Sequence, residues 1–306
     1  MISQLKSSCS LEQTSKENIF YKLQSVEPHA TGLALPSHMA VLDDDSVLVS
    51  EFARGVIRDV TKGGDYSDTN KDVFVSGMKH PGGITQLKNK RIIAADSGTG
   101  KVYDISAGGN AGDYTKIFEG ISHPYGVIEF RNKLYTSFSN NEMSGIAQIE
   151  EGQIFDFKTH AYVFGFPVVL TLEPYRSLAG CGGSWSTAVL DDKLMFSHAA
   201  LGAIYDVSEG GSYDQYRNSL YAWGLNLPLG MTIDPINRQL FVCERGNGDI
   251  KIINIHGGYS RFAQPLVTGF KDCSCIRFIK DGSIAYVCDR AVGTVYKLTF
   301  DLHKIS

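Results

Sequence analysis

Short runs of apolar residues, separated by turns rich in glycine or aspartate, recur along the whole chain. The runs "MAVL" and "VLVSEF" flank the turn "DDDS", and "MTID" and "QLFVCE" flank "PINR". Apolar runs of this length, bounded by turn residues, predict β-strands. Helical periodicity is nowhere sustained, so the pattern predicts an all-β protein.

The strands belong to a repeated unit that two glycines mark. The first glycine opens a motif of glycine, an apolar residue and usually a proline, as in "TGLALP" (31–36) and "WGLNLP" (223–228). Six such glycines stand 45, 43, 60, 44 and 45 residues apart, namely Gly32, Gly77, Gly120, Gly180, Gly224 and Gly269. A second glycine follows each after 22 to 25 residues, namely Gly55, Gly100, Gly145, Gly202, Gly248 and Gly293. Six units of four short strands, about 44 residues each, predict a six-bladed β-propeller with four antiparallel strands per blade.

The two ends of the chain fit one blade. The last unit runs out after its third strand, "TVYKLTFD", whereas "NIFYKLQSV" (18–26) precedes the first unit where a fourth strand would stand. We expect the amino-terminal strand to complete the last blade, which closes the ring and leaves no open sheet edge. The predicted organisation is an amino-terminal extension over residues 1–17 and a single propeller over residues 18–306.

The unit resembles those of NHL-repeat propellers and of the superfamily that contains gluconolactonase, regucalcin and strictosidine synthase. Segments such as "HPGGITQLKNKRIIAADSGTGKVYDI" carry this resemblance, which extends over residues 18–300. It implies the six-bladed fold but leaves function open, because such propellers include hydrolases, lyases, cyclases and binding modules. Metal-dependent lactonases of this group place carboxylate or asparagine ligands near the start of the inner strands. The equivalent residues here include none of these, so we expect no metal or other cofactor: Ser37, Gly82, Tyr125, Trp185, Leu229 and Ser274.

Composition and charge limit the binding partners and the cellular compartment that we expect for the protein. The net charge is −4 and no basic stripe is visible, which argues against nucleic acid and anionic membrane surfaces as partners. No apolar stretch approaches ~18 residues, and the amino-terminal segment lacks the apolar core of a signal peptide, so we expect a cytoplasmic protein. The six cysteines have no zinc-site spacing, and we expect free, mostly buried thiols.

Candidate functional residues are those at which one unit departs from the others. Four residues before each second glycine stand Glu51, Asp96, Asn141, His198, Glu244 and Asp289. The acids at this position are expected to cap turns, but His198 takes an acid's place. Because imidazole exchanges protons near neutral pH, we interpret His198, with Glu244 or Glu51, as catalytic, a structural histidine being the alternative.

Large residues at the start of three inner strands suggest a binding wall. Tyr125, Trp185 and Leu229 stand where other units have small residues, which favours a flat organic ligand; the alternative is that they plug the channel. We predict a small-molecule enzyme of cyclase, lyase or hydrolase type, whose substrate is an aromatic or apolar organic molecule. A non-catalytic NHL-type binding propeller is the alternative function. The predicted substrate-binding residues are Trp185, Tyr125, His38, His123, Leu229, Ser37 and Ser274.

Overall fold

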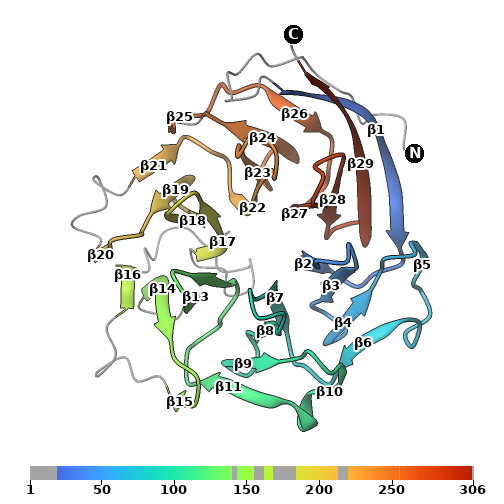
Figure 1. Ribbon diagram of the computed structural model, residues 1–306, viewed down its shortest axis with the longest axis vertical. Coiled ribbons are helices and arrows are strands. Elements are labelled where there is room, and N and C mark those ends of the chain that lie inside the picture. The colour runs from blue at the N-terminus through green and yellow to red at the C-terminus, as the bar shows by residue number, and fades with distance from the viewer. Residues whose placement is uncertain are drawn as a thin grey trace.

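The protein is described here from a computed structural model, over residues 19–139, 143–154, 162–167, 184–212, 220–254 and 256–304. These residues form six small sheets around a central axis, as Figure 1 shows. They contain one 3-10 helix, η1 (Ala111–Asp113), and no α-helix. The prediction of an all-β, six-bladed propeller is confirmed. Within the same residues, no helix has the length and apolar character needed to span a bilayer.

Each blade is an antiparallel sheet of four strands that runs from the axis outward. The innermost strands are β2 (Pro36–Val41), β7 (Pro81–Gln86), β12 (Val127–Phe130), β17 (Ser184–Leu190), β22 (Pro228–Ile233) and β27 (Cys273–Phe278). The second strands are β3 (Val47–Glu51), β8 (Ile92–Asp96), β13 (Lys133–Ser139), β18 (Lys193–His198), β23 (Leu240–Glu244) and β28 (Ile284–Asp289). The third strands are β4 (Val56–Asp59), β9 (Lys101–Asp104), β14 (Met143–Ile149), β19 (Ala203–Asp206), β24 (Asp249–Ile253) and β29 (Thr294–Lys304). The outer strands are β6 (Val73–Ser76), β11 (Thr115–Glu119), β16 (Tyr162–Pro167), β21 (Leu220–Trp223), β26 (Pro265–Thr268) and β1 (Ile19–Thr31).

A fifth, two-residue strand extends five of these six sheets. Each of these strands lies in the turn between the third and outer strands of one blade. It pairs in parallel with the outer strand of the preceding blade, as Gly109 and Asn110 do with Val75 and Ser76. The five are β5 (Gly64–Asp65), β10 (Gly109–Asn110), β15 (Gln153–Ile154), β20 (Gly211–Ser212) and β25 (Gly258–Tyr259). The sequence predicts most of these segments only as turns, and in the structure they also join neighbouring blades. The sheet that ends in β26 has no fifth strand, because in the next blade β29 and β1 belong to opposite ends of the chain.

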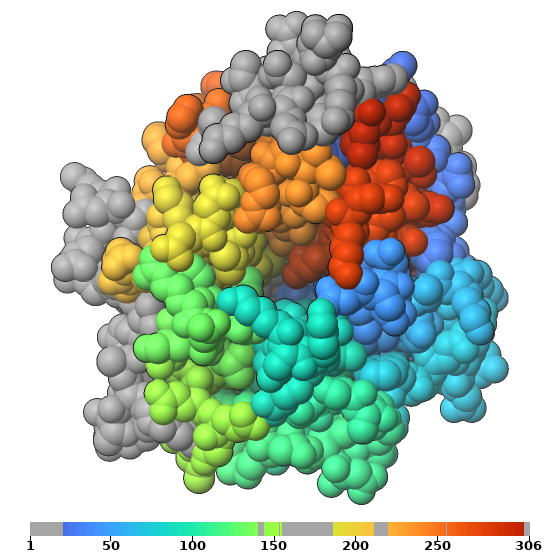
Figure 2. All heavy atoms as spheres, viewed as in Figure 1, coloured from blue at the N-terminus to red at the C-terminus, as the bar shows by residue number. Residues whose placement is uncertain are grey.

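The ring is closed by both ends of the chain, as expected from the sequence. β1 runs antiparallel to β29, with pairs from Ile19 with Lys304 to Ala30 with Val295. In Figure 2 the amino-terminal and carboxy-terminal parts of the described chain lie against each other. Since β1 covers the outer edge of β29, the last blade presents no unpaired third strand.

Six apolar clusters form the core, each between two neighbouring blades. Leu48 and Ile57 of the first blade, for example, pack with Ile84 and Ala94 of the second. The last blade likewise packs against the first, where Cys288 and Val295 meet Val49. Burial between blades is the main source of stability for a fold made of short sheets.

The second glycine of the repeat contacts the segment that leads from the outer strand of its own blade to the next blade. Gly248 has φ +69°, and a Cβ atom there would collide with the carbonyl of Phe270, which lies between β26 and β27. The same carbonyl-to-glycine contact recurs for Gly55, Gly100, Gly202 and Gly293. In the third blade the assignment of Gly145 as second glycine is wrong, because Gly145 lies within β14 and pairs with Phe138. Ser139, paired with Ser144, therefore takes the position that the sequence assigned to Asn141, which lies outside the described residues.

Candidate functional site

The residues that we selected by comparing the six units of the sequence lie on one face of the disc. Each inner strand begins opposite the end of its second strand, as Pro36 pairs with Glu51 and Pro228 with Glu244. These positions surround one end of the axis, which we call the upper mouth. The inner strands end at the other end of the axis, the lower mouth.

Glu51 and Glu244 are buried and hold the segments that precede their own inner strands. Glu51 accepts a hydrogen bond from the Ala34 N–H (2.7 Å) and pairs with Arg54 and with the buried Arg58. Glu244 is bonded in the same way, by the Asn226 N–H (2.8 Å) and by Lys251 Nζ (2.9 Å). Asp96 and Asp289 also accept backbone N–H groups of these segments. The hydrogen bonds of all four are those of structural carboxylates, as the turn-capping interpretation describes.

His198 is buried and takes part in a turn of its own blade. Its Nδ1 accepts the Leu201 N–H (3.2 Å), so the ring proton is on Nε2, which faces Ser144 Oγ at 3.4 Å. Burial lowers the pKa of His198 to about 3, so the imidazole is neutral at physiological pH. His198 thus accepts a backbone N–H as the acids do, and a catalytic role for it stays a prediction.

Of the predicted binding residues, Tyr125 and Leu229 meet at the upper mouth. They form a buried apolar cluster with Ala199, against which Leu227 packs. Tyr125 is 1% exposed and Leu229 2%, so this side of the axis is filled rather than open.

The remaining predicted residues lie apart from this cluster. Ser37 and His38 are buried, with His38 Nδ1 3.5 Å from Ser37 Oγ. Ser274 Oγ donates to the Pro36 carbonyl (3.2 Å) and so ties the sixth blade to the first. His123 is exposed, and its Nδ1 lies 3.1 Å from Ser122 Oγ. The side chain of Trp185 lies outside the described part of the structure.

A chain of polar and aromatic contacts runs along the other side of the upper mouth, from the fifth blade to the second. Arg245 Nε lies 2.8 Å from Asp272 Oδ1, and the Arg290 N–H donates to the Asp272 carbonyl (3.0 Å). The Arg290 guanidinium lies 5.9 Å from the centre of the Phe52 ring, which stacks on His80 with centroids 4.5 Å apart. We call Arg245, Asp272, Arg290, Phe52 and His80 the polar arc.

The carboxyl group of Asp272 is the titratable centre of the polar arc. Burial raises the pKa of Asp272, and the nearby Arg290 and Arg245 offset only part of this effect. A carboxyl group that titrates closer to neutral pH, beside two fixed cations, can donate or accept a proton at an organic substrate.

The comparison of the six sequence units did not select Asp272 or Phe52, although the sequence contains a signal for Asp272. Asp272 precedes its inner strand, at the position of Leu35, His80, His123 and Leu227 in other units. It is the only acid in that set, so comparing units at this position would have selected it.

No metal centre is formed by the residues described. Among them, no three His, Cys, Asp or Glu side chains are placed to hold a metal ion. The four described cysteines are free and buried, namely Cys243, Cys273, Cys275 and Cys288. Burial raises the pKa of the Cys275 thiol, which disfavours the thiolate that binds metals. Whether the protein works without a metal is not tested by this geometry and stays a prediction.

Known structures share the fold at low sequence identity. An enzyme of the carbohydrate-active family AA12 from Trichoderma reesei is 11% identical with a TM-score of 0.64, over 95% of this chain and 100% of its own. A gluconolactonase from Xanthomonas campestris is 9% identical with a TM-score of 0.60, over 97% and 99%. An inactive variant of virginiamycin B lyase from Staphylococcus aureus, solved with quinupristin, is 13% identical with a TM-score of 0.51, over 91% and 99%.

These similarities confirm the resemblance to the six-bladed propeller superfamily at the level of fold. No protein-family model matches the chain, and a search of curated proteins also finds no match. The fold is therefore one that lyases and lactonases use, and the function has to be argued from the site.

Proposed function

We propose that the protein is a small-molecule enzyme that acts at the upper mouth by acid–base chemistry. The observation that carries this proposal is the buried Asp272 carboxyl group, held 2.8 Å from Arg245 and beside Arg290, with its pKa raised. Neutral Asp272 would protonate a leaving group, and ionised Asp272 would remove a proton. The two guanidinium groups would stabilise negative charge that develops on the substrate.

The surroundings of Asp272 favour an aromatic or apolar organic substrate. The stacked rings of Phe52 and His80 offer a flat surface on one side of the mouth. The buried apolar cluster of Tyr125, Ala199 and Leu229 fills the other side and would bound the space for a substrate there. Cyclisation, elimination and hydrolysis all need proton transfer of this kind, and the similarity to lyase and lactonase folds supports the last two.

A non-catalytic binding propeller is the second candidate. Glu51, Glu244 and His198 are the side chains that the sequence suggested for catalysis. Their hydrogen bonds to the backbone are structural, which favours this second candidate. In this case the upper mouth would hold an organic ligand without turning it over.

The test compares wild-type protein with Asp272→Asn on a library of aromatic lactones, aryl esters and cyclic depsipeptides, with products followed by mass spectrometry. We expect turnover by the wild type and a kcat lower by ~10²–10⁴-fold in Asp272→Asn. Asp192→Asn, at an exposed aspartate near the lower mouth, is the matched control and should retain activity. Equal turnover by Asp272→Asn would refute the assignment, and saturable binding without products would favour the second candidate.

A further inference from the structure

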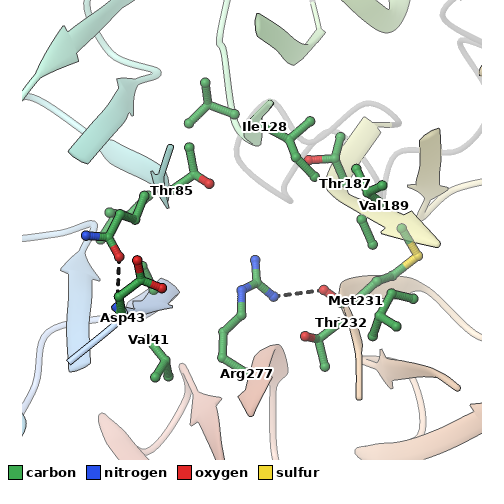
Figure 3. A pocket seen from close by; sticks show the side chains of 15 residues that line it. Val41, Asp43, Thr85, Ile128, Thr187, Val189, Met231, Thr232 and Arg277 are labelled. Carbon is green, nitrogen blue, oxygen red and sulfur yellow. Dashed lines mark hydrogen bonds between the residues drawn. The ribbon is translucent and has the colours of Figure 1, made fainter. Parts of the chain in front are cut away.

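A cavity of about 280 Å³ lies at the lower mouth, where the inner strands end (Figure 3). Its volume is near the lower limit of small-molecule pockets. All six inner strands contribute to its wall, with residues such as Val41, Thr85, Ile128, Val189, Thr232 and Arg277. It does not include the residues of the upper mouth, so it is a separate site.

Among the residues that the structure describes, Arg277 is the one cation in the wall of this cavity. It is the fifth residue of its inner strand, where the other units have Ala40, Thr85, Ile128, Ala188 and Thr232. Figure 3 shows its side chain extending into the middle of the cavity. The repeat therefore puts an uncharged residue at this position in five blades and a guanidinium in the sixth.

The bonds of Arg277 leave much of the guanidinium group available. Its Nη1 donates to the carbonyls of Met231 (2.8 Å) and Ile276 (2.7 Å). Among the residues that the structure describes, Nε and Nη2 have no acceptor and no carboxylate pairs with Arg277. A half-buried cation without a counter-ion is unfavourable, and an anionic ligand would relieve this cost.

The charges at the rim do not supply the missing counter-ion. Among the described residues, Asp43 is the only carboxylate in the wall, and its oxygens already pair with Lys90 and with Lys280 (3.3 Å). Within the wall itself, Arg277 therefore has no free carboxylate as a partner. Its guanidinium group attracts an anion.

The rest of the wall indicates an organic anion rather than an inorganic one. Val41, Ile128 and Val189 give it apolar surface, while Thr85 and Thr232 add hydroxyl groups beside the guanidinium (Figure 3). A planar carboxylate matches two N–H groups of one arginine, and the apolar surface suits a hydrocarbon body.

We propose that the lower-mouth cavity binds a small organic monocarboxylate, with the carboxylate on Nε and Nη2 of Arg277. The apolar body of the ligand packs against Val41, Ile128 and Val189. The site is independent of the upper mouth and of the chemistry proposed there.

The probes are benzoate and hexanoate, with benzyl alcohol as the uncharged counterpart and inorganic phosphate as the inorganic anion. Isothermal titration of wild-type protein should give one benzoate site per chain, with benzyl alcohol and phosphate at least about tenfold weaker. Arg277→Met should weaken benzoate by about 10- to 100-fold, while Arg277→Lys retains part of the affinity. Arg238→Met, which removes an exposed arginine of the same face that pairs with Asp191, is the matched control and should change it less than about twofold.

Four results would overturn the proposal. These are no carboxylate binding by wild-type protein at ~10 mM, phosphate binding as tight as benzoate, equal losses in Arg277→Met and Arg238→Met, and full binding by Val189→Phe. The last variant fills the cavity without touching the guanidinium, so it tests the site even where Arg277→Met fails to fold. Since binding is measured without turnover, failure here leaves the proposed enzyme function unaffected.

Discussion

At the scale of single residues, the same position of the unit carries different groups that all accept a backbone N–H, although from different segments. Glu51 and Glu244 accept N–H groups of the segments before their inner strands, and His198 accepts the Leu201 N–H through Nδ1. A carboxylate at this position can also hold a cation, as Glu51 holds Arg58. A neutral imidazole cannot, and it becomes a weak point of the fold in acid.

The folding stability of the protein should therefore depend on His198 below neutral pH. In the folded chain the pKa of His198 is lowered from 6.5 to about 3, so between these values the unfolded chain binds a proton that the folded chain does not. Stability is lost as pH falls below 6.5, by up to about 1.4 kcal/mol per pH unit from this group. Urea unfolding at pH 7 and pH 4.5 should show a smaller difference for His198→Asn, whose Oδ1 can still accept the Leu201 N–H.

The control for this measurement is His256→Asn, which replaces an exposed histidine. An unchanged pH dependence in His198→Asn would mean that the pKa of the imidazole is not lowered in the folded protein. The side chain could then exchange protons near neutral pH, as the catalytic interpretation requires.

At the scale of strands and turns, the sequence predicts what is periodic and misses what is not. Four strands per unit follow from alternating apolar runs and turns, and they are present. The two-residue strands such as β10 give no periodic signal, because two residues cannot define an alternation. In the third blade Gly145 kept the spacing of the repeat, but the hairpin between β13 and β14 closes two residues earlier, with Ser139 paired to Ser144 as Glu51 is to Val56.

The same reasoning explains how much of the site was predictable. The six sequence units were compared at two positions. The residues at these positions lie on one face of the disc, where Tyr125 contacts Leu229. Asp272 and Arg277 stand at two other positions, where a comparison of units would have marked them as the only charges of their kind. Their bonds with Arg245 and with the Met231 carbonyl depend on the closed ring, which no single unit encodes.

The contact of the second glycine with the segment that leads to the next blade can be tested with Gly248→Ala. An added Cβ at φ +69° would meet the Phe270 carbonyl, which is backbone and cannot move away cheaply. We expect a loss in unfolding free energy well above the ~1–2 kcal/mol of left-handed strain alone, as measured by urea unfolding. Gly152→Ala is the matched control, since Gly152 has φ +82° but no atom of the described residues within 4 Å of the added atom. Similar losses in both variants would show that the contact with the Phe270 carbonyl adds nothing.

At the scale of the whole molecule, the fold depends on one pairing between the chain ends. Tyr21, Leu23 and Val26 of β1 pack onto the cluster between the last two blades. The Tyr21 hydroxyl also donates to Asp234 of the fifth blade (2.5 Å). β1 therefore joins the ring by backbone pairing, by burial and by a side-chain hydrogen bond.

Two truncations separate the predicted extension from the propeller. Deleting residues 1–17 should leave the thermal unfolding midpoint within a few degrees of wild type, since the propeller is predicted to start at residue 18. Deleting residues 1–31 removes β1 and exposes the edge of β29, so circular dichroism should show no cooperative transition and size-exclusion chromatography should show aggregates. A monomeric, cooperatively unfolding 1–31 deletion would contradict the role of β1 in closure.

The pairing of β1 with β29 also sets the order of events during synthesis. The strand that leaves the ribosome first must wait for the one that leaves last, which takes on the order of 15–60 s for 306 residues at the usual rate of elongation. During that time the blades between them can form, but the ring stays open and β1 has only the two-residue strand β5 as a partner. The nascent chain thus exposes strand edges for longer than a fold built from local contacts would, and β1 is the strand whose main edge stays unpaired longest.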